Sequence, residues 1–184
     1  MSRGNRKEAL YRDRDDYETF MKLLELASKN CFVKIHSFCL MTNHFHLLIE
    51  TTTTEVWKFM GKLLTNYAAY FNRKYGYTGH LFEKRYTSCI IEDDIYFLEA
   101  SRYIHLNPVK ANMVRGPLDY EYSSYRIFMD EAKSTLLNKN KVLGLFLNND
   151  KERYRVYVEG ENSHRDKEVV IQKLMGENDN WLPW

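Results

Sequence analysis

The sequence predicts an α+β fold, because segments with helical periodicity alternate with segments that are typical of β-strands. Apolar residues recur every three or four positions in three stretches, which is the spacing of an amphipathic helix. Two adjacent strand-like segments separate the first two of these stretches, and another strand-like segment precedes the third. The helical stretches are 13–29, 55–74 and 94–107, and the strand-like segments are 31–41, 41–50 and 81–91.

Composition indicates a soluble globular protein. The 184 residues suffice for one domain with a sizeable core, and 44% hydrophobic and 28% charged residues are ordinary values. A net charge of +2 excludes a strong overall positive field, so any nucleic-acid partner requires a local basic patch. No apolar run approaches the roughly 20 residues that cross a bilayer. The start, MSRGNRKEALYRD, lacks the apolar core of a signal peptide, so we expect a cytoplasmic protein.

The first predicted helix and the hairpin after it have clear boundary signals. Asp15 followed three residues later by Glu18 predicts a capping box at the start of the helix. Thr42 and Asn43 separate the two strands, which predicts a tight antiparallel hairpin. Cys31, Cys39 and Cys89 lie in strand-like segments without C-x-x-C spacing, so we expect reduced core thiols.

The second half of the chain is predicted in less detail. The strand character of 81–91 is clearest at 86–91, and Pro108 is expected to end the third helix. Residues 109–130 are expected to form a loop with aromatic anchors, and the more polar remainder to form short helices. We therefore predict a main domain at 1–130 and a helical C-terminal extension at 131–184. Its expected helices are 141–147, 151–158 and 167–175.

Two histidines one residue apart suggest a metal site on the second strand of the hairpin. His44 and His46 share one face of the strand, with Cα atoms roughly 6–7 Å apart, and Phe45 lies on the opposite face. Two neutral imidazoles at this spacing hold one divalent metal ion when another ligand joins them. The alternative is a pair of surface histidines on an amphipathic strand.

Tyr103 and Asn107 are four residues apart and therefore share one face of the third helix. Beside a metal ion, Asn107 offers an amide oxygen as third ligand, and Tyr103 offers a phenol oxygen that can attack a phosphodiester. The alternative reading places Tyr103 in the core and makes Asn107 the residue that caps the helix before Pro108.

These elements together resemble a single-tyrosine HUH transposase, most closely the REP-associated tyrosine transposases. The resemblance spans roughly residues 1–160 and includes the family's motifs in their usual order. The motifs are SRGN (2–5), MTNHFHLLI (41–49), GHLFEKRYTSCII (79–91), YIHLNPVKANMV (103–114) and YSSY (122–125). The resemblance implies a ferredoxin-like (RRM-like) antiparallel sheet with the histidines on a central strand, in a protein of the bacterial cytoplasm.

The resemblance also implies a site and an activity. His44, His46 and Asn107 would bind Mg²⁺ or Mn²⁺, and Tyr103 would be the nucleophile that cleaves and rejoins single-stranded DNA beside a hairpin. The product of cleavage would be a covalent 5′-phosphotyrosine. We further expect DNA contacts from one cationic and aromatic group of residues on the histidine face. This group comprises Arg3, His80, Lys84, Arg85 and Tyr86.

The family's usual first strand, before the SRGN element, does not precede this element here. We therefore expect either a missing edge strand or another segment in its place, such as the alternating Tyr154, Val156 and Val158. A missing edge strand exposes backbone groups that can pair with another chain, so the protein is expected to be a monomer or a homodimer.

Two other functions are compatible with parts of this pattern. A catalytically inactive module could bind single-stranded nucleic acid on a ferredoxin-like sheet through its aromatic residues, but it would not need a phenol facing two histidines. A metal-dependent hydrolase would need carboxylates near the metal, and Glu50 is the one available on the same strand. The sequence favours the transposase over both.

Overall fold

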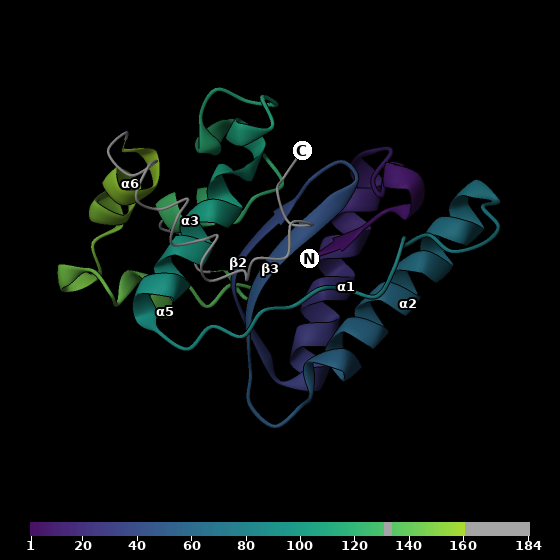
Figure 1. Ribbon diagram of the computed structural model, residues 1–184, viewed down its shortest axis with the longest axis horizontal. Coiled ribbons are helices and arrows are strands. Elements are labelled where there is room, and N and C mark those ends of the chain that lie inside the picture. Colours follow the sequence, from purple (N-terminus) through teal and green to yellow (C-terminus); the bar gives the residue numbers. More distant parts are fainter. Residues whose placement is uncertain (131–133, 161–184) are drawn as a thin grey trace.

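A three-stranded antiparallel sheet lies between two layers of helices in the computed structural model, which describes residues 1–130 and 134–160 (Figure 1). The strands are β1 (Ser2–Arg3), β2 (Val33–Leu40) and β3 (His44–Thr51), in the order β1-β3-β2. The predicted α+β class and the predicted hairpin of β2 and β3 are confirmed. Within the described ranges, no helix has the length and apolar character needed to cross a membrane.

Two long helices cover one face of this sheet. They are α1 (Arg14–Cys31) and α2 (Val56–Tyr75), which pack against each other beside the strands (Figure 1). Phe20 of α1 meets Phe45 of β3 at 4.8 Å between ring centroids, and Tyr67 of α2 lies 5.0 Å from Phe20. All three rings are fully buried, and each contributes roughly 2–3 kcal/mol through the apolar area it removes from water.

The helix α3 (Asp94–Lys110) packs on the opposite face of β2 and β3. The prediction that Pro108 ends this helix is wrong, because Pro108 lies inside the last turn. Proline has no N–H, so the helix loses one hydrogen bond there, to the carbonyl of Ile104. The turn persists because Ala111 still donates to the carbonyl of Asn107, at 2.9 Å, and Asn107 and Pro108 are buried.

The remaining helices are short. The loop predicted at 109–130 contains η2 (Pro117–Asp119) and α4 (Tyr125–Met129), and η1 (Asn5–Lys7) follows β1. The C-terminal part contains α5 (Asn140–Leu143), η3 (Leu147–Asn149) and α6 (Lys151–Glu159), which confirms two predicted helices in outline. Of these short helices, η2, α5 and α6 pack against α3. Tyr154, Val156 and Val158 lie in α6, so they do not supply an edge strand. The helix predicted at 167–175 lies outside the described residues.

Residues 81–91 do not form the predicted regular strand. Part of the segment instead lies antiparallel to the first five residues through a few backbone hydrogen bonds. Asn5 donates to Leu81, Glu83 donates to Arg3, and Thr87 donates to Met1, at 2.8–3.0 Å. The pairing is irregular because one residue lies between 1 and 3 on one side, whereas three residues lie between 83 and 87 on the other. The segment therefore takes the outer place beside β1 that a fourth strand has in a ferredoxin-like sheet.

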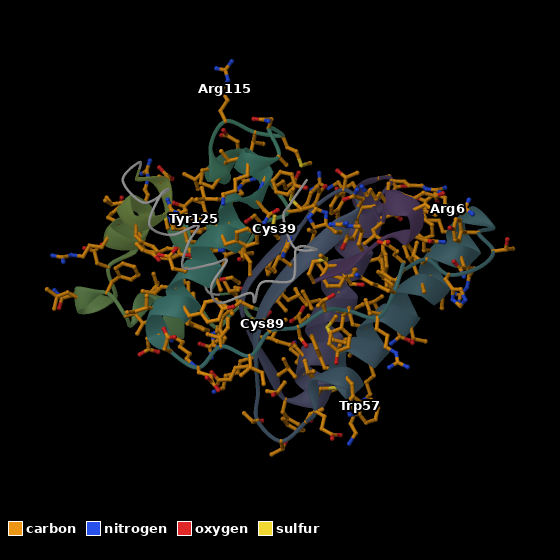
Figure 2. The ribbon with its side chains drawn as sticks, in the orientation of Figure 1. Arg6, Cys39, Trp57, Cys89, Arg115 and Tyr125 are labelled. Atoms are coloured by element: carbon orange, nitrogen blue, oxygen red, sulfur yellow. The ribbon has the colours of Figure 1, made fainter. Side chains whose placement is uncertain are left out.

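The expectation about cysteines is partly wrong. Cys31 and Cys39 are buried and unbridged as predicted, but Cys89 is exposed. Figure 2 shows Cys39 deep among the side chains of the sheet. Cys89 is exposed because its segment does not join the sheet in a regular ladder.

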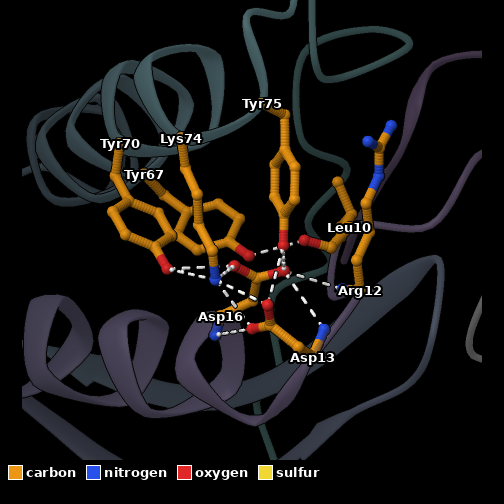
Figure 3. A network of polar contacts seen from close by, with 8 residues as sticks. All are labelled: Leu10, Arg12, Asp13, Asp16, Tyr67, Tyr70, Lys74 and Tyr75. Carbon is orange, nitrogen blue, oxygen red and sulfur yellow. Dashed lines mark hydrogen bonds and ion pairs between the residues drawn. The ribbon is translucent and has the colours of Figure 1, made fainter.

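The start of α1 is fixed by a buried carboxylate. The N-cap is Asp13, with Asp16 completing the capping box, so the predicted box at Asp15 and Glu18 is wrong. Asp16 is fully buried and accepts hydrogen bonds from three side chains of α2 and two backbone N–H groups (Figure 3). These donors are Tyr70 at 3.0 Å, Lys74 at 2.9 Å, Tyr75 at 2.7 Å, the N–H of Arg12 at 2.7 Å and the N–H of Asp13 at 3.4 Å.

These contacts couple the packing of α1 and α2 to the charge of Asp16. Burial opposes ionisation, but the bonds from Lys74 and the other donors hold the pKa of Asp16 below its usual value. The stabilisation is therefore present above the pKa of an unfolded aspartate, about 4, and is lost as pH falls through the lower folded value.

We expect Asp16→Asn to lower the free energy of unfolding by about 2 kcal/mol at pH 7, because hydrogen bonds to a buried charge are lost. The difference in the free energy of unfolding between this variant and the unchanged protein should shrink as the pH falls below about 4. Urea unfolding at several pH values measures both effects. Asp15→Asn, on the exposed first turn, is the matched control and should cost about 0.5 kcal/mol or less. Equal losses in the two variants would contradict the role of Asp16.

Candidate active site

His44 and His46 face the same side of β3, as the alternation of a strand requires. Their ring centroids are 5.1 Å apart with nearly perpendicular planes. His44 is half-buried and His46 is 9% exposed. Asn43, in the turn between the strands, contacts the His44 ring through its Oδ1 atom, at 2.7 Å from Nδ1. Because Asn43 Oδ1 can only accept, Nδ1 of His44 carries the proton, and Nε2 keeps a lone pair available.

The face that carries the histidines is covered by α3. The Tyr103 ring of α3 lies 5.6 Å from the His46 ring in an edge-to-face arrangement. The sequence pattern alone suggested that this face would be open and the other face would sit on the core. The structure corrects this, because both faces of the hairpin are covered by helices. The cover brings Tyr103 to the histidines.

Asn107 lies one turn after Tyr103 and joins the same group of side chains. It is 4% exposed, and its amide nitrogen donates to the carbonyl of Tyr103 at 3.4 Å. Its side chain also lies close enough to His44 and to the phenol of Tyr103 to influence the pKa of both. The two pairs proposed from spacing, one on a strand and one on a helix, therefore meet in space.

The electrostatics of the group favour neutral imidazoles. Burial, with a smaller effect from the nearby Arg3 charge, lowers the pKa of His44 to about 4, although the hydrogen bond with Asn107 opposes this. Burial and the neighbouring His44 also hold the pKa of His46 well below its usual value. At neutral pH both rings are uncharged, which is the protonation state that a metal ligand requires.

Tyr103 presents a half-buried phenol. Burial raises its pKa above the usual value, while the hydrogen bond with Asn107 and the charge of Arg3 act in the opposite direction. The ammonium group of Lys110 lies 5.2 Å from the centre of the Tyr103 ring. The positive charge of Arg3 therefore offsets part of the burial that disfavours a phenolate.

The site opens into a cavity of about 620 Å³ between β3, the segment at 86–91 and α3. His46, Tyr86 and Tyr103 are among the residues that line it. Of the group expected to contact DNA, Tyr86 and Arg3 therefore lie at or near the site. His80, Lys84 and Arg85 are exposed and precede Tyr86 on the same segment, and none of them lines the cavity.

A comparison with known families decides the class of the protein. The family described as transposase IS200 like matches residues 1–107, which include both histidines, Tyr103 and Asn107. The chain belongs to the IS200-like transposase family. Among solved structures, a REP-associated tyrosine transposase bound to a REP hairpin has a similar fold, with a TM-score of 0.59 and 15% identity. The match covers 73% of this chain and 82% of that one. No curated protein sequence matches the chain.

The recognition of the family from its motifs is thus confirmed, and so is the fold class. The division of this transposase at residue 130 stays a prediction, as does the assignment of roles to the individual site residues.

The donor set at the site suits a small divalent cation. Within residues 1–130 and 134–160, no group of three His, Cys, Asp or Glu side chains could hold a metal. If His44 and His46 hold a divalent cation, the third protein donor would therefore be of another kind, such as the amide oxygen of Asn107. Two neutral imidazoles and one amide oxygen would leave coordination positions for substrate oxygens, so these residues could together hold one divalent cation.

Glu50 does not supply the carboxylate that a hydrolase reading would require. It accepts hydrogen bonds from Lys34 at 2.7 Å and from Lys141 at 2.8 Å, and it contacts His36 at 3.3 Å. The two lysines lower the pKa of Glu50 to about 2, so the carboxylate is engaged in ion pairs away from the two histidines. This weakens the case for a water-activating site.

Sequence reasoning missed two residues of the transposase site. Asn43 was interpreted only as part of a turn, yet it fixes the tautomer of His44. Its position immediately before His44 is a signal that could have indicated this role. Lys110 was assigned to a loop because Pro108 was expected to end the helix, and it therefore did not join the group around Tyr103.

We expect His44 of the metal-free transposase to titrate with a pKa near 4, so that its ring is neutral throughout the physiological range. Nuclear magnetic resonance of the ring protons across pH 3 to 8 measures this value directly. Arg3→Gln should raise the pKa of His44, because it removes a positive charge that disfavours protonation. An unperturbed value near 6.5 in the unchanged protein would contradict the burial of this ring.

Proposed function

We propose that this transposase cleaves and rejoins single-stranded DNA beside hairpins, with Tyr103 as nucleophile and a covalent 5′-phosphotyrosine as intermediate. The observation that carries the proposal is the convergence of Tyr103 and Asn107 from α3 with His44 and His46 from β3. Neither an inactive binding module nor a packing core requires a half-buried phenol beside a pair of neutral imidazoles. Membership of a transposase family supports the same reading.

In this proposal, His44, His46 and Asn107 hold Mg²⁺ or Mn²⁺. When bound, the cation supplies Lewis-acid polarisation of a phosphodiester oxygen and balances charge in the transition state. The protein's own residues keep the imidazoles neutral by burial and hold Nδ1 of His44 in the protonated tautomer through Asn43.

The proposed step is a transesterification that conserves the number of phosphodiester bonds. The oxygen of Tyr103 attacks phosphorus, and the bond between phosphorus and the 3′-oxygen of the upstream strand breaks. The phenol loses its proton, and the departing 3′-oxygen gains one through solvent and leaves as a hydroxyl group. Because the new ester stores the energy of the broken one, a later 3′-hydroxyl can reverse the step and join the strands.

DNA is proposed to lie across the mouth of the cavity. Arg3, Lys84 and Arg85 would pair with phosphates, and Tyr86 and His80 would stack on bases. Single strands are favoured over duplex, since a phosphate must reach a recessed phenol. The similar structure was solved with a REP hairpin, which supports hairpin DNA as the partner of this chain.

We expect Tyr103→Phe to abolish the covalent DNA adduct while hairpin binding stays within about twofold, because the change removes only the nucleophilic oxygen. Incubation with Mn²⁺ and labelled hairpin DNA, followed by denaturing electrophoresis, measures the adduct. Tyr77→Phe is the matched control, because Tyr77 is a half-buried tyrosine that packs on Phe71 outside the site. An undiminished adduct in Tyr103→Phe would refute the nucleophile assignment.

We expect His44→Ala with His46→Ala to reduce Mn²⁺ affinity more than about 10-fold and to remove metal-dependent cleavage. Asn107→Ala should also weaken Mn²⁺ binding, whereas Asn107→Asp should preserve or strengthen it, because a carboxylate oxygen replaces the amide oxygen. Titration calorimetry with Mn²⁺ measures these affinities without DNA. Cleavage by the double histidine variant at the normal rate would rule out the ligand role.

A further inference from the structure

The helix that carries Tyr103 is held from its opposite side by buried hydrogen bonds. Ser101 and His105 of α3 are four residues apart and share one face, as Tyr103 and Asn107 do. The two pairs are offset by two residues, or about 200° around the helix, so they lie on nearly opposite faces. Ser101 and His105 are both 0% exposed. The side of α3 away from the histidines is therefore polar, buried and in need of partners.

Tyr154 of α6 supplies a partner to both of these side chains. Its hydroxyl lies 2.6 Å from the Oγ of Ser101 and 2.7 Å from the Nδ1 of His105. Tyr154 is itself 0% exposed, and its ring lies 5.9 Å from the His105 ring. One phenol hydroxyl thus bridges two positions that are a full turn apart on α3. A bridge of this kind resists both rotation and sliding of the helix.

The chain of contacts continues at both ends to β2, the edge strand of the sheet. Ser101 contacts the Oγ of Ser37 at 2.7 Å, and His105 Nε2 contacts the Oγ of Ser124 at 2.7 Å. The Oγ of Ser124 donates to the carbonyl of Phe38 at 3.1 Å and accepts from its N–H at 2.9 Å. The path begins and ends on neighbouring residues of β2, the strand paired with the histidine strand β3.

The hydrogen positions along this path are mutually consistent. Burial lowers the pKa of His105 to about 3, so its ring is neutral and one nitrogen donates while the other accepts. The hydroxyl of Ser124 donates its proton to the carbonyl of Phe38, so its oxygen accepts from Nε2 of His105. Because Nε2 then carries the proton of the neutral ring, Nδ1 accepts from the hydroxyl of Tyr154. Ser101 then donates to Tyr154. The hydroxyls of Ser124, Tyr154 and Ser101 thus each donate one hydrogen bond and accept another. All of these bonds can form together in only one placement of α3.

We propose that Tyr154 is a positioning residue that fixes the rotation of α3 and thereby the place of the Tyr103 oxygen, an inference that rests on the proposed function. A phenol oxygen stands roughly 9 Å from the helix axis, so a rotation of about 10° displaces it by about 1.5 Å. A displacement of about 1 Å can lower a rate 100-fold. The hydroxyl of Tyr154 thus acts on the reaction from the far side of the helix without touching DNA.

The test compares Tyr154→Phe with Tyr125→Phe. Tyr125 is also 0% exposed, and its hydroxyl donates to Glu159 of α6 at 2.9 Å. Each variant loses one buried hydroxyl that binds α6 to its surroundings. Both rings pack near His105, at 5.2 Å for Tyr125 and 5.9 Å for Tyr154, but of the two hydroxyls only that of Tyr154 hydrogen-bonds to α3. With Mn²⁺ and saturating hairpin DNA, adduct formation should slow about 10-fold or more in Tyr154→Phe. In Tyr154→Phe, the DNA concentration that gives half-maximal adduct formation should stay within about twofold of that of the unchanged protein. Tyr125→Phe should form the adduct at the normal rate.

A second measurement does not depend on DNA or on metal. A 3-fluorotyrosine placed at position 103 gives one fluorine resonance that reports the surroundings of that ring. This resonance should shift or broaden in Tyr154→Phe and stay in place in Tyr125→Phe. If Tyr154→Phe does not fold, Ser101→Ala removes the other end of the bridge and should give the same shift.

The outcomes separate this inference from the proposed function. A normal adduct rate and an unshifted resonance in Tyr154→Phe would overturn the positioning role, as would equal losses in the two tyrosine variants. If the unchanged protein forms no adduct at all, the proposed function fails. The fluorine resonance then still decides whether Tyr154 sets the place of position 103.

Discussion

The packing of α3 across the β2–β3 hairpin is the constraint on which the rest of the structure depends. Without this helix the histidines would face solvent, and their imidazoles would titrate near their ordinary pKa. With it, they lie in a region of low polarity beside a phenol and an amide. The same contact excludes water, lowers the basicity of two rings and places a nucleophile, so one packing interaction creates both the geometry and the electrostatics of the site.

The two sides of the sheet serve different purposes. The side of α1 and α2 is an aromatic core closed by the Asp16 ion-pair network, and it provides stability (Figure 3). The side of α3 carries polar groups that are individually costly to bury and are therefore hydrogen-bonded almost throughout. Polar groups of this kind specify one arrangement more sharply than apolar packing does, which suits a surface that must hold a reactive oxygen in place.

Much of the fold and of the candidate site was predictable from the sequence. The alternation around His44 and the spacing of Tyr103 and Asn107 were sufficient to nominate four residues that the structure brings together. The failures have physical causes. Pro108 was expected to stop a helix, because a local rule about proline takes no account of the buried contacts that keep the last turn in place. The strand at 86–91 has strong β-propensity, but propensity does not form a ladder without a regular partner.

The tyrosine and histidine contacts behind α3 were not predictable at all. Tyr154 lies in a polar segment about fifty residues after the α3 residues that it contacts, and its role follows only from three-dimensional contacts. The sequence predicted a helix at 151–158, while the alternation with Val156 and Val158 also offered the segment as an edge strand. Tyr154 and Val158 are buried on this helix, but their spacing does not indicate which helix they pack against.

The exposed Cys89 has a practical consequence for the study of this protein. Its segment borders the cavity, and its sulfur lies 3.2 Å from the hydroxyl of Tyr96, whereas Cys31 and Cys39 are enclosed by the core. A thiol-specific fluorophore would therefore attach at the rim of the cavity without any engineered substitution. The native chain thus carries its own attachment point for an optical reporter of what enters the cavity.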